Sequence, residues 1–230
     1  MKKPIYSEQQ TLFGHKTVIG FGDEKLYVKE INRDIANDII IKNHYSGKIY
    51  NATYIHLGVF INNKLHGVLQ YGYAMNPNSM SSVVANTKKN EYLELNRMWI
   101  EDDVGDYVES KSIAYSIKFI KMAFPKVKWI QSFADERCGG YGVVYQACSF
   151  DYFGEHTSDF WELDGVVYHN IQMTVSEDSH RYKGEARYLQ QNKDRATKMQ
   201  LRQFRYIKFL KQNSKKYCLL KQQEYPKHYL

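Results

Sequence analysis

Residues 107–124 carry the clearest helix pattern in the chain, and strand patterns flank them on both sides. The apolar residues recur at helical spacing, and the stripe consists of Ile113, Ile117, Ile120 and Phe124. Pro125 ends the pattern, because proline cannot continue a helix. Residues 91–100 before this helix and 127–133 after it favour strands. The chain therefore contains a strand, a helix and a second strand in direct succession.

A hairpin precedes this unit. Residues 54–61 and 64–73 are rich in β-forming residues, and Asn62-Asn63 between them is a tight-turn signal. Ile31, Ile35 and Ile39 predict an earlier helix over residues 31–43. Residues 75–90 are rich in Asn and Ser and are expected to form a loop.

The second half continues in the same mixed style. We expect a short helix at 141–148, strands at 160–163 and 166–173 joined by Asp164-Gly165, a helix around 185–200, and β-like stretches near 204–210 and 217–220. This order predicts an α/β (α+β) protein with a single sheet covered by helices.

Composition limits the class of protein. With 230 residues, 43% hydrophobic and 25% charged, the chain can bury one domain, or one domain and an appendage. The longest apolar runs are far too short for a bilayer, and no apolar segment follows Met1-Lys2-Lys3 as a secretory signal would. Three cysteines without CxxC spacing favour reduced thiols. We expect a cytoplasmic protein without a membrane partner.

The positive charge is concentrated at one end. Residues 181–230 contain 14 Lys/Arg and 3 Asp/Glu, whereas residues 1–180 contain 18 and 22. Such a block is typical of polyanion binding, although it also occurs as a solvated basic face. We expect a domain over 1–180 and a basic extension over 181–230 that packs on it and binds nucleic acid; dimerisation is another expected use of this extension.

Arg97 and Ser110 could form an anion site. Arg97 lies near the end of one predicted strand, and Ser110 lies at the beginning of the 107–124 helix. A helix N-terminus presents free N–H groups, and an arginine can bind the same anion through two hydrogen bonds. The alternative is an ordinary first-turn serine and an arginine paired with a carboxylate.

Asp135, Tyr145 and His44 are the other candidate site residues. Asp135 follows a strand and could orient or deprotonate an amine, or could simply form a turn. Tyr145 could protonate a leaving group or pack in the core. His44 stands in His44-Tyr45-Ser46 at a helix end, without an HxH or HxxxH partner, so spacing gives little support for a metal site.

Taken together, these segments resemble the phage Mom family, whose fold is similar to that of the GNAT acyltransferases. The matching motifs run over about 44–173 and touch LRQFRYIKFL at 201–210. They are HYS at 44–46, LNRMW at 95–99, ES at 109–110, SFAD at 132–135, VYQA at 144–147 and the aromatic YFG at 152–154. The resemblance implies a GNAT-like, mixed, largely antiparallel sheet flanked by helices.

The family converts adenine in phage DNA to N6-carbamoylmethyladenine and thereby protects that DNA from host restriction nucleases. The resemblance places His44 and Tyr45 at the reactive centre. It implies that Arg97 and Ser110 hold the acyl donor, and that Asp135 and Tyr145 handle the substrate and transfer protons. The family is also linked to iron, with His44 as the implied ligand.

The donor is a point at which the chain departs from the acyltransferase pattern. The loop at 102–107 has one glycine and three aspartates where GNAT enzymes have a Gly-rich pyrophosphate loop, and carboxylates there would repel a pyrophosphate. This argues against acetyl-CoA. Because N6-carbamoylmethyladenine is an isomer of N6-glycyladenine, an activated glycine such as glycyl-tRNA is the alternative donor.

Two other functions remain open from the sequence. The first is an acyltransferase that acts on the amines of tRNA or protein, in which case the basic extension would bind RNA. The second is a DNA-binding protein without catalysis. Both predict binding that weakens steeply with salt, so substitution at Asp135 or Arg97 separates them better than salt does.

Overall fold

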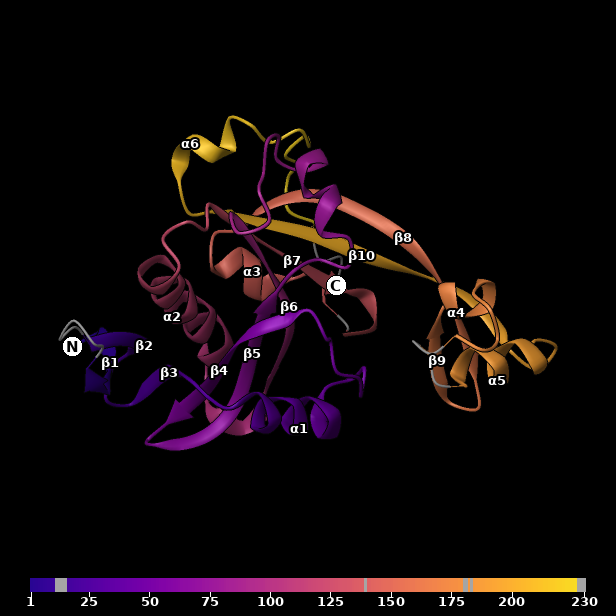
Figure 1. The fold of residues 1–230 in the computed structure, drawn as a ribbon, viewed down its shortest axis with the longest axis horizontal. Helices are drawn as coiled ribbons and strands as arrows, with labels where there is room; N and C mark the ends of the chain where they lie inside the picture. The colour runs from indigo at the N-terminus through magenta and orange to yellow at the C-terminus, as the bar shows by residue number, and fades with distance from the viewer. Residues whose placement is uncertain (11–15, 139, 180–181, 183, 227–230) are drawn as a thin grey trace.

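The computed structural model describes residues 1–10, 16–138, 140–179, 182 and 184–226, and these residues build one mixed sheet (Figure 1). The strand order within the described residues is β1-β2-β3-β4-β5-β6-β7-β10-β8-β9. Neighbouring strands are antiparallel except β6 and β7, which are parallel. The strands are β1 (Lys3–Gln10), β2 (Lys16–Gly22), β3 (Leu26–Glu30), β4 (Thr53–Ile61), β5 (Lys64–Gly72), β6 (Tyr92–Ile100), β7 (Trp129–Asp135), β8 (Asp151–Leu163), β9 (Val166–His169) and β10 (Thr197–Phe209). The expected mixed, largely antiparallel sheet is confirmed.

Helices cover both faces of the sheet. The α-helices are α1 (Arg33–Asn43), α2 (Val108–Ala123), α3 (Val143–Ala147), α4 (Ile171–Thr174), α5 (Glu185–Gln191) and α6 (Gln212–Lys215), and the 3₁₀ turns are η1 (Pro77–Ser82), η2 (Asp102–Val104) and η3 (Glu136–Cys138). Ile40 of α1 packs with Val68 and Trp99, whereas Ile113 of α2 belongs to the cluster that contains Leu69. Because side chains alternate along a strand, α1 and α2 lie on opposite faces.

The predicted elements of the first half are confirmed. The hairpin between β4 and β5 turns at Asn62 and Asn63, whose φ angles are 48° and 66°. Both residues therefore have the left-handed backbone of a tight hairpin turn, which asparagine tolerates better than most residues. The helix predicted at 107–124 is α2, and the helix predicted at 31–43 is α1. Strands β1, β2 and β3 were not predicted.

Three predictions in the second half were wrong. The helix predicted over 185–200 ends at Gln191, and β10 begins at Thr197, because pairing with β8 overrides the local pattern. The strand predicted over 166–173 ends at His169, and α4 follows. Residues 217–220 form no strand; Cys218 makes a single bridge to Val84. In addition, η1 lies inside the predicted loop 75–90.

Strand β10 lies inside the sheet rather than beside it. It pairs with β7 from Gln203 to Phe209 and with β8 from Thr197 to Ile207. The far ends of β8 and β10 extend away from the other strands and carry a small lobe with β9, α4 and α5 (Figure 1). This lobe has its own core, in which Leu163, Tyr168 and Leu189 are buried. The boundary proposed at 180–181 falls on residues outside the described part.

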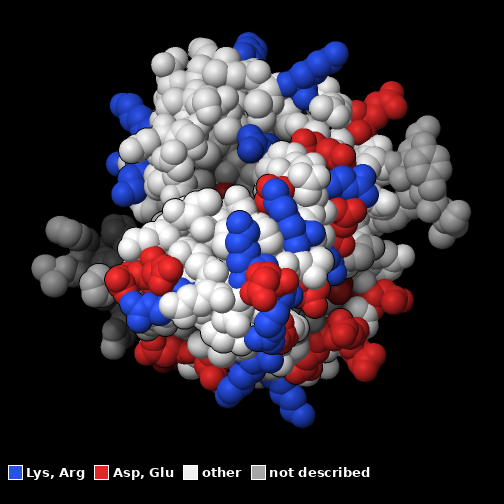
Figure 2. Space-filling view, turned by 90° about the vertical axis from the view of Figure 1, so that its right-hand side faces the viewer, with Lys and Arg blue, Asp and Glu red and all other residues white. Residues whose placement is uncertain are grey.

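Acidic residues neutralise part of the basic C-terminal segment. Among the described residues, five of its cations pair with carboxylates that precede residue 181, and these pairs are Arg187 with Glu177 and Asp178, Arg195 with Asp164, Lys198 with Asp159, Arg202 with Glu136 and Glu155, and Lys215 with Asp151. Figure 2, which views the molecule from the lobe side, accordingly shows blue and red side chains interspersed. Part of the positive charge of residues 181–230 is therefore neutralised by acidic residues from earlier in the same chain.

None of the helices in the described ranges is both long enough and apolar enough to cross a membrane.

The central position of α2 leads to a stability prediction. Ile113 is completely buried between α2 and the sheet, so Ile113→Ala leaves a cavity and should lower the free energy of unfolding by about 2–5 kcal/mol. Urea unfolding followed by circular dichroism measures this change. Lys118→Ala, on the exposed side of the same helix, should change it by less than ~0.5 kcal/mol. Equal effects of the two variants would contradict the assigned orientation of α2.

Candidate active site

His44 caps the C-terminus of α1, and its ring is held by the next turn of chain. The backbone N–H of Ser46 donates to His44 Nδ1 at 3.1 Å, and Ser46 Oγ lies 2.8 Å from the same nitrogen. Burial, and then the nearby cations Arg97 and Arg137, lower the pKa of His44 to about 4. The imidazole is therefore neutral at neutral pH, and because Nδ1 accepts hydrogen bonds, Nε2 carries the proton.

Tyr45, Asp135 and Arg137 form a connected group beside His44. The rings of His44 and Tyr45 lie 4.2 Å apart, and the Tyr45 hydroxyl donates to Asp135 Oδ2 at 3.4 Å. Arg137 Nε donates to Asp135 Oδ1 at 2.9 Å and its Nη2 donates to Oδ2 at 2.6 Å. The Arg137 guanidinium also lies 4.9 Å from the ring centres of both Tyr45 and Phe160. One arginine thus connects the end of β7 to α1 and to β8.

Arg137 determines the charge state of Asp135. Burial of the Asp135 carboxyl acts to raise its pKa, but the hydrogen bonds from Arg137 outweigh burial, and the net pKa is lowered. The carboxylate is therefore ionised and bound at both oxygens, which makes it a weak proton acceptor. Burial raises the pKa of Tyr45, and the Asp135 carboxylate raises it further, so the Tyr45 phenol keeps its proton.

Arg97 projects from β6 on the α1 face, next to His44 and Tyr45. A β-bulge at Asn96 precedes it, because Arg97 pairs with Gln70 while Leu95 pairs with Tyr71. Arg97 donates to backbone carbonyls, that of Asn96 at 2.7 Å and that of Lys48 at 3.4 Å. Within the described residues no carboxylate lies at ion-pair distance from Arg97. The guanidinium can therefore bind an anion or a developing oxyanion.

Glu94 is a further candidate site residue, which the sequence patterns did not indicate. It precedes Arg97 on β6, and its two carboxylate oxygens accept from Gln131 Nε2 at 2.7 Å and Asn96 Nδ2 at 2.8 Å. Burial raises its pKa, against the effect of these two donors and of Arg97 and Arg205. The one signal in the sequence is a glutamate inside the apolar run Tyr92-Leu93-Glu94-Leu95. No sequence pattern indicated Arg137 of η3, which lowers the pKa of Asp135, or Arg205 of β10, which acts to lower the pKa of Glu94.

Strands β6 and β7 separate immediately after Glu94. They pair at Tyr92, Leu93 and Glu94, opposite Trp129, Ile130 and Gln131, and at no later described position. Ser132 lies just beyond the last pair, and its hydroxyl donates to the Leu95 carbonyl at 3.3 Å. The gap between the diverging strands opens beside Glu94 and Arg97.

The structure does not place Tyr145 with the other four. Tyr145, on α3, is buried in the core cluster of α2, with its ring 5.4 Å from Tyr206 and 5.6 Å from Phe150. Burial raises its pKa to about 12, and its hydroxyl bonds with Ser132 beside the strand gap. It therefore lies on the other face of the sheet from His44, Tyr45, Arg97 and Asp135.

Ser110 also lies apart from Arg97. It is the third residue of α2, is half-buried, and donates from its hydroxyl to the Tyr107 carbonyl at 3.1 Å. Tyr107 caps α2 with a φ of 62° and no side-chain hydrogen bond, so the first N–H groups of the helix lack a side-chain cap. The aspartates of the preceding loop, Asp102, Asp103 and Asp106, are all exposed.

No metal centre is evident in the described ranges, which contain no group of three or more His, Cys, Asp or Glu side chains placed to hold an ion. His44 as an iron ligand stays a prediction.

The profile of the Mom protein family matches residues 25–227. The chain belongs to the Mom protein family. A Mom relative, the methylcarbamoylase Mom of Escherichia phage Mu, is 47% identical over 215 residues, which cover 91% of this chain and 87% of that protein. The matched span thus includes α1, β6, β7 and β10, the elements that carry the candidate active site.

Solved acetyltransferases have limited structural similarity to this chain. The ribosomal-protein-S5-alanine acetyltransferase from Vibrio fischeri is 12% identical with a TM-score of 0.48, and the alignment covers 83% of this chain and 96% of that chain. An acetyltransferase of the GNAT family from Streptococcus pneumoniae is 13% identical with a TM-score of 0.44, covering 80% and 99%.

The state of His44 can be tested through the pH dependence of stability. Its pKa of about 4 in the folded protein lies below the ordinary value of 6.5. Between these values the unfolded chain binds a proton that the folded chain does not, so stability falls as the pH is lowered from 6.5 toward 4. His44→Gln should reduce this fall in the free energy of unfolding, measured by urea titration at several pH values. Asn43→Gln, exposed at the end of α1, should keep the wild-type pH dependence; an unchanged curve for His44→Gln would contradict the assignment.

Proposed function

We propose that this Mom family protein converts adenine in phage DNA to N6-carbamoylmethyladenine, which protects that DNA from host restriction nucleases. The relative from phage Mu carries the name of the corresponding enzyme, a methylcarbamoylase, at 47% identity. The single structural observation that supports the proposal is the convergence of Arg97, neutral His44, Tyr45 and Asp135 on one sheet face beside the strand gap. Acyl transfer to an amine needs a cation or donor for the oxyanion, and a proton acceptor.

The donor that fits this proposal is an activated glycine. The carbamoylmethyl group contains nitrogen, and an acetyl group does not, so acetyl-CoA alone cannot supply it. Transfer of a glycyl group to N6, followed by attack of the glycyl amine on C6 and cleavage of the original C6–N6 bond, gives the product with all atoms balanced. The exposed carboxylates of Asp102, Asp103 and Asp106 near the α2 N-terminus also disfavour a pyrophosphate there. Glycyl-tRNA is one such donor.

We assign roles to the residues of this face from their contacts. Arg97 would stabilise the oxyanion that forms when the N6 amine attacks the glycyl carbonyl, because it is a cation without a carboxylate partner among the described residues. The protonated Nε2 of His44 would donate to the leaving group. Asp135, bound by Arg137, would position Tyr45 rather than act as the base. Glu94 would accept the N6 proton, because its hydrogen-bond donors are the neutral amides of Gln131 and Asn96 rather than an arginine, and burial raises its pKa.

Access to the adenine amine requires the base to leave the duplex, because N6 is hydrogen-bonded inside it. Tyr45 is 53% exposed, and the part of its ring that His44 and Arg137 do not cover would contact the extruded base. The DNA backbone would lie along basic residues of the C-terminal segment. The cations there that lack an ion pair within the described part, such as Lys216 and Lys221, are better suited to phosphates than the five that are paired.

Nucleoside mass spectrometry of DNA from cells expressing the protein tests the function. We expect an adenosine heavier by one carbamoylmethyl group, and Arg97→Met should reduce its yield by about 10²-fold or more, as loss of an oxyanion donor does. Arg33→Met, which removes an exposed arginine at the beginning of α1, is the matched control and should leave the yield unchanged. Unmodified DNA with the wild-type protein would refute the proposed function, and total RNA would then be analysed in the same way.

The assignment of the proton acceptor has its own test. Glu94→Gln keeps the shape of the side chain but removes the base, so modification should fall by about 10²–10⁴-fold. Asp135→Asn should act mainly through Tyr45, so its loss should be smaller and should resemble that of Tyr45→Phe. The readout is the modified fraction of adenine at equal protein level, with circular dichroism as the check on folding. A larger loss for Asp135→Asn than for Glu94→Gln would reverse the two roles.

A further inference from the structure

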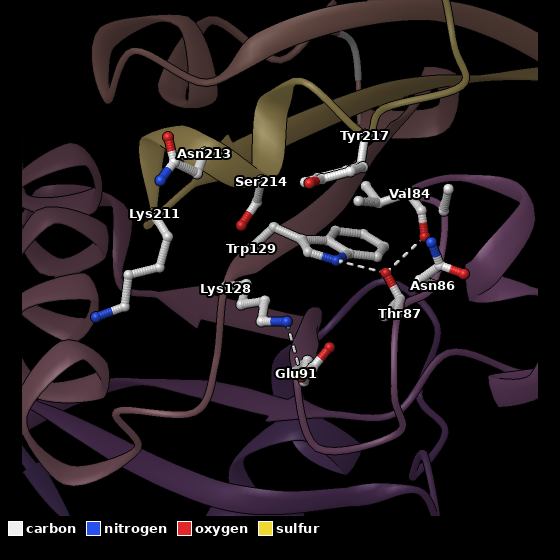
Figure 3. A pocket seen from close by; sticks show the side chains of 11 residues that line it. Val84, Asn86, Thr87, Glu91, Lys128, Trp129, Lys211, Asn213, Ser214 and Tyr217 are labelled. Carbon is white, nitrogen blue, oxygen red and sulfur yellow. Dashed lines mark hydrogen bonds and ion pairs between the residues drawn. The ribbon is translucent and has the colours of Figure 1, made fainter.

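A pocket of about 390 Å³ lies far from the candidate active site, at the other end of β7. Its lining comes from the loop before β6, from the start of β7, and from the segment after β10. Figure 3 shows Trp129 and Tyr217 between Lys211 on one side and Asn86 on the other. Strand β7 runs from Trp129 at this pocket to Asp135 at the active site. At ~3.3 Å per residue, the two places are roughly 20 Å apart.

The walls of this pocket are fixed by hydrogen bonds between the three segments. Trp129 is fully buried, and its indole N–H donates to Thr87 Oγ1 at 3.2 Å, while the Thr87 hydroxyl donates to the Val84 carbonyl at 2.6 Å. The Ala85 N–H donates to the Tyr217 carbonyl at 2.8 Å. The N–H of Leu210 donates to the Lys128 carbonyl at 2.8 Å. The hollow is therefore held open by the fold and is largely formed before any ligand binds.

Lysines surround the pocket and a second hollow of about 560 Å³ that shares Glu91, Lys128 and Lys211 with it. The lysines of the two hollows are Lys88, Lys126, Lys128 and Lys211, and the one carboxylate is Glu91. Glu91 is already bound, because Lys128 Nζ lies 2.8 Å from Oε1 and the Lys88 N–H donates to Oε2 at 3.2 Å. Lys88, Lys126 and Lys211 make no ion pair with the part of the chain that the structure describes. The hollows together favour an anion.

The uncharged lining indicates which anion. Tyr217 is 57% exposed, so the face of its ring is free to stack on a flat ligand. Asn86 and Asn213 supply amide groups, each with a donor and an acceptor, at the same pocket. A flat aromatic wall, amides and lysines within one preformed hollow match a nucleotide, whose base stacks and whose phosphates bind cations. An acidic peptide would use the lysines but would have no need of the aromatic wall.

We propose that this pocket is a second nucleic-acid site, which holds one unpaired nucleotide of a strand against Tyr217 with the flanking phosphates on Lys126 and Lys211. The ligand class is argued from the lining of the pocket alone, and it stands whether or not the protein modifies adenine. Both an opened DNA strand and the single-stranded end of an RNA have this chemistry, and the experiment below compares them.

The test is fluorescence anisotropy of the full-length protein with a short fluorescent single-stranded DNA, the RNA of the same sequence, and the DNA duplex. Tyr217→Ala should weaken binding of at least one single strand by about tenfold, as expected for the loss of one base stack, whereas Tyr217→Phe should keep it. Lys211→Met should weaken binding and reduce the slope of affinity against salt by about one between about 50 mM and 200 mM salt. Lys64→Met, an exposed lysine at the β4–β5 turn that lines neither hollow, is the matched control and should bind like the wild type.

The possible results distinguish DNA binding from RNA binding, and they distinguish failure of this proposal from failure of the proposed function. Tyr217-dependent binding of DNA alone, or of RNA alone, supports the pocket and identifies its strand. Wild-type affinity of Tyr217→Ala for both strands overturns the proposal, and so does equal competition by poly-glutamate and by unlabelled strand. The Arg97→Met protein should retain the Tyr217-dependent part of the binding. Failure of the modification experiment and failure of this one are therefore distinguishable.

Discussion

The parallel contact between β6 and β7 is the constraint on which the candidate active site depends. The two strands pair at three positions and then diverge. The Gln131 amide donates a hydrogen bond to the Glu94 carboxylate at the last pair and so stabilises the end of the paired region. Beyond it, side chains from both strands project into the same space without a ladder of backbone bonds between them. This geometry places Arg97 of β6 and Asp135 of β7 on the face of the sheet that α1 covers.

Several residues of the candidate site could be predicted from the sequence because they stand in short motifs. The sequence places His44-Tyr45 at a helix end, Arg97 in LNRMW and Asp135 after a strand, and the structure brings them to one face. Their state was not predictable. Burial mainly lowers the pKa of His44, and Arg97 and Arg137 lower it further, while the Asp135 carboxylate is bound by Arg137; local sequence patterns contain neither the burial nor these contacts.

Other features depend on long-range pairing, which local patterns do not contain. The first residues of β10 were predicted to be helical, because the local sequence Thr197-Lys198-Met199 does not indicate pairing with β8. Ser110 and Arg97 looked like two parts of one anion site, since they are close in sequence, but the alternation of β6 and the crossing of α2 put them on opposite faces. The sequence suggests that the basic segment is one binding surface. In the structure some of its cations, such as Arg187, Arg195 and Arg202, form ion pairs within the chain, and others have no ion pair within the described residues.

The internal position of β10 has a consequence for synthesis of the chain. Strands β7 and β8 follow one another in sequence, yet β10 separates them in the sheet, so both wait with an open edge until residues 197–209 emerge. A ribosome-bound chain therefore completes its central sheet only after residues 197–209 have been translated. Exposed edges are templates for aggregation. A premature stop after β8 but before β10 thus leaves the facing edges of β7 and β8 unpaired, a much more damaging loss than the removal of a terminal appendage.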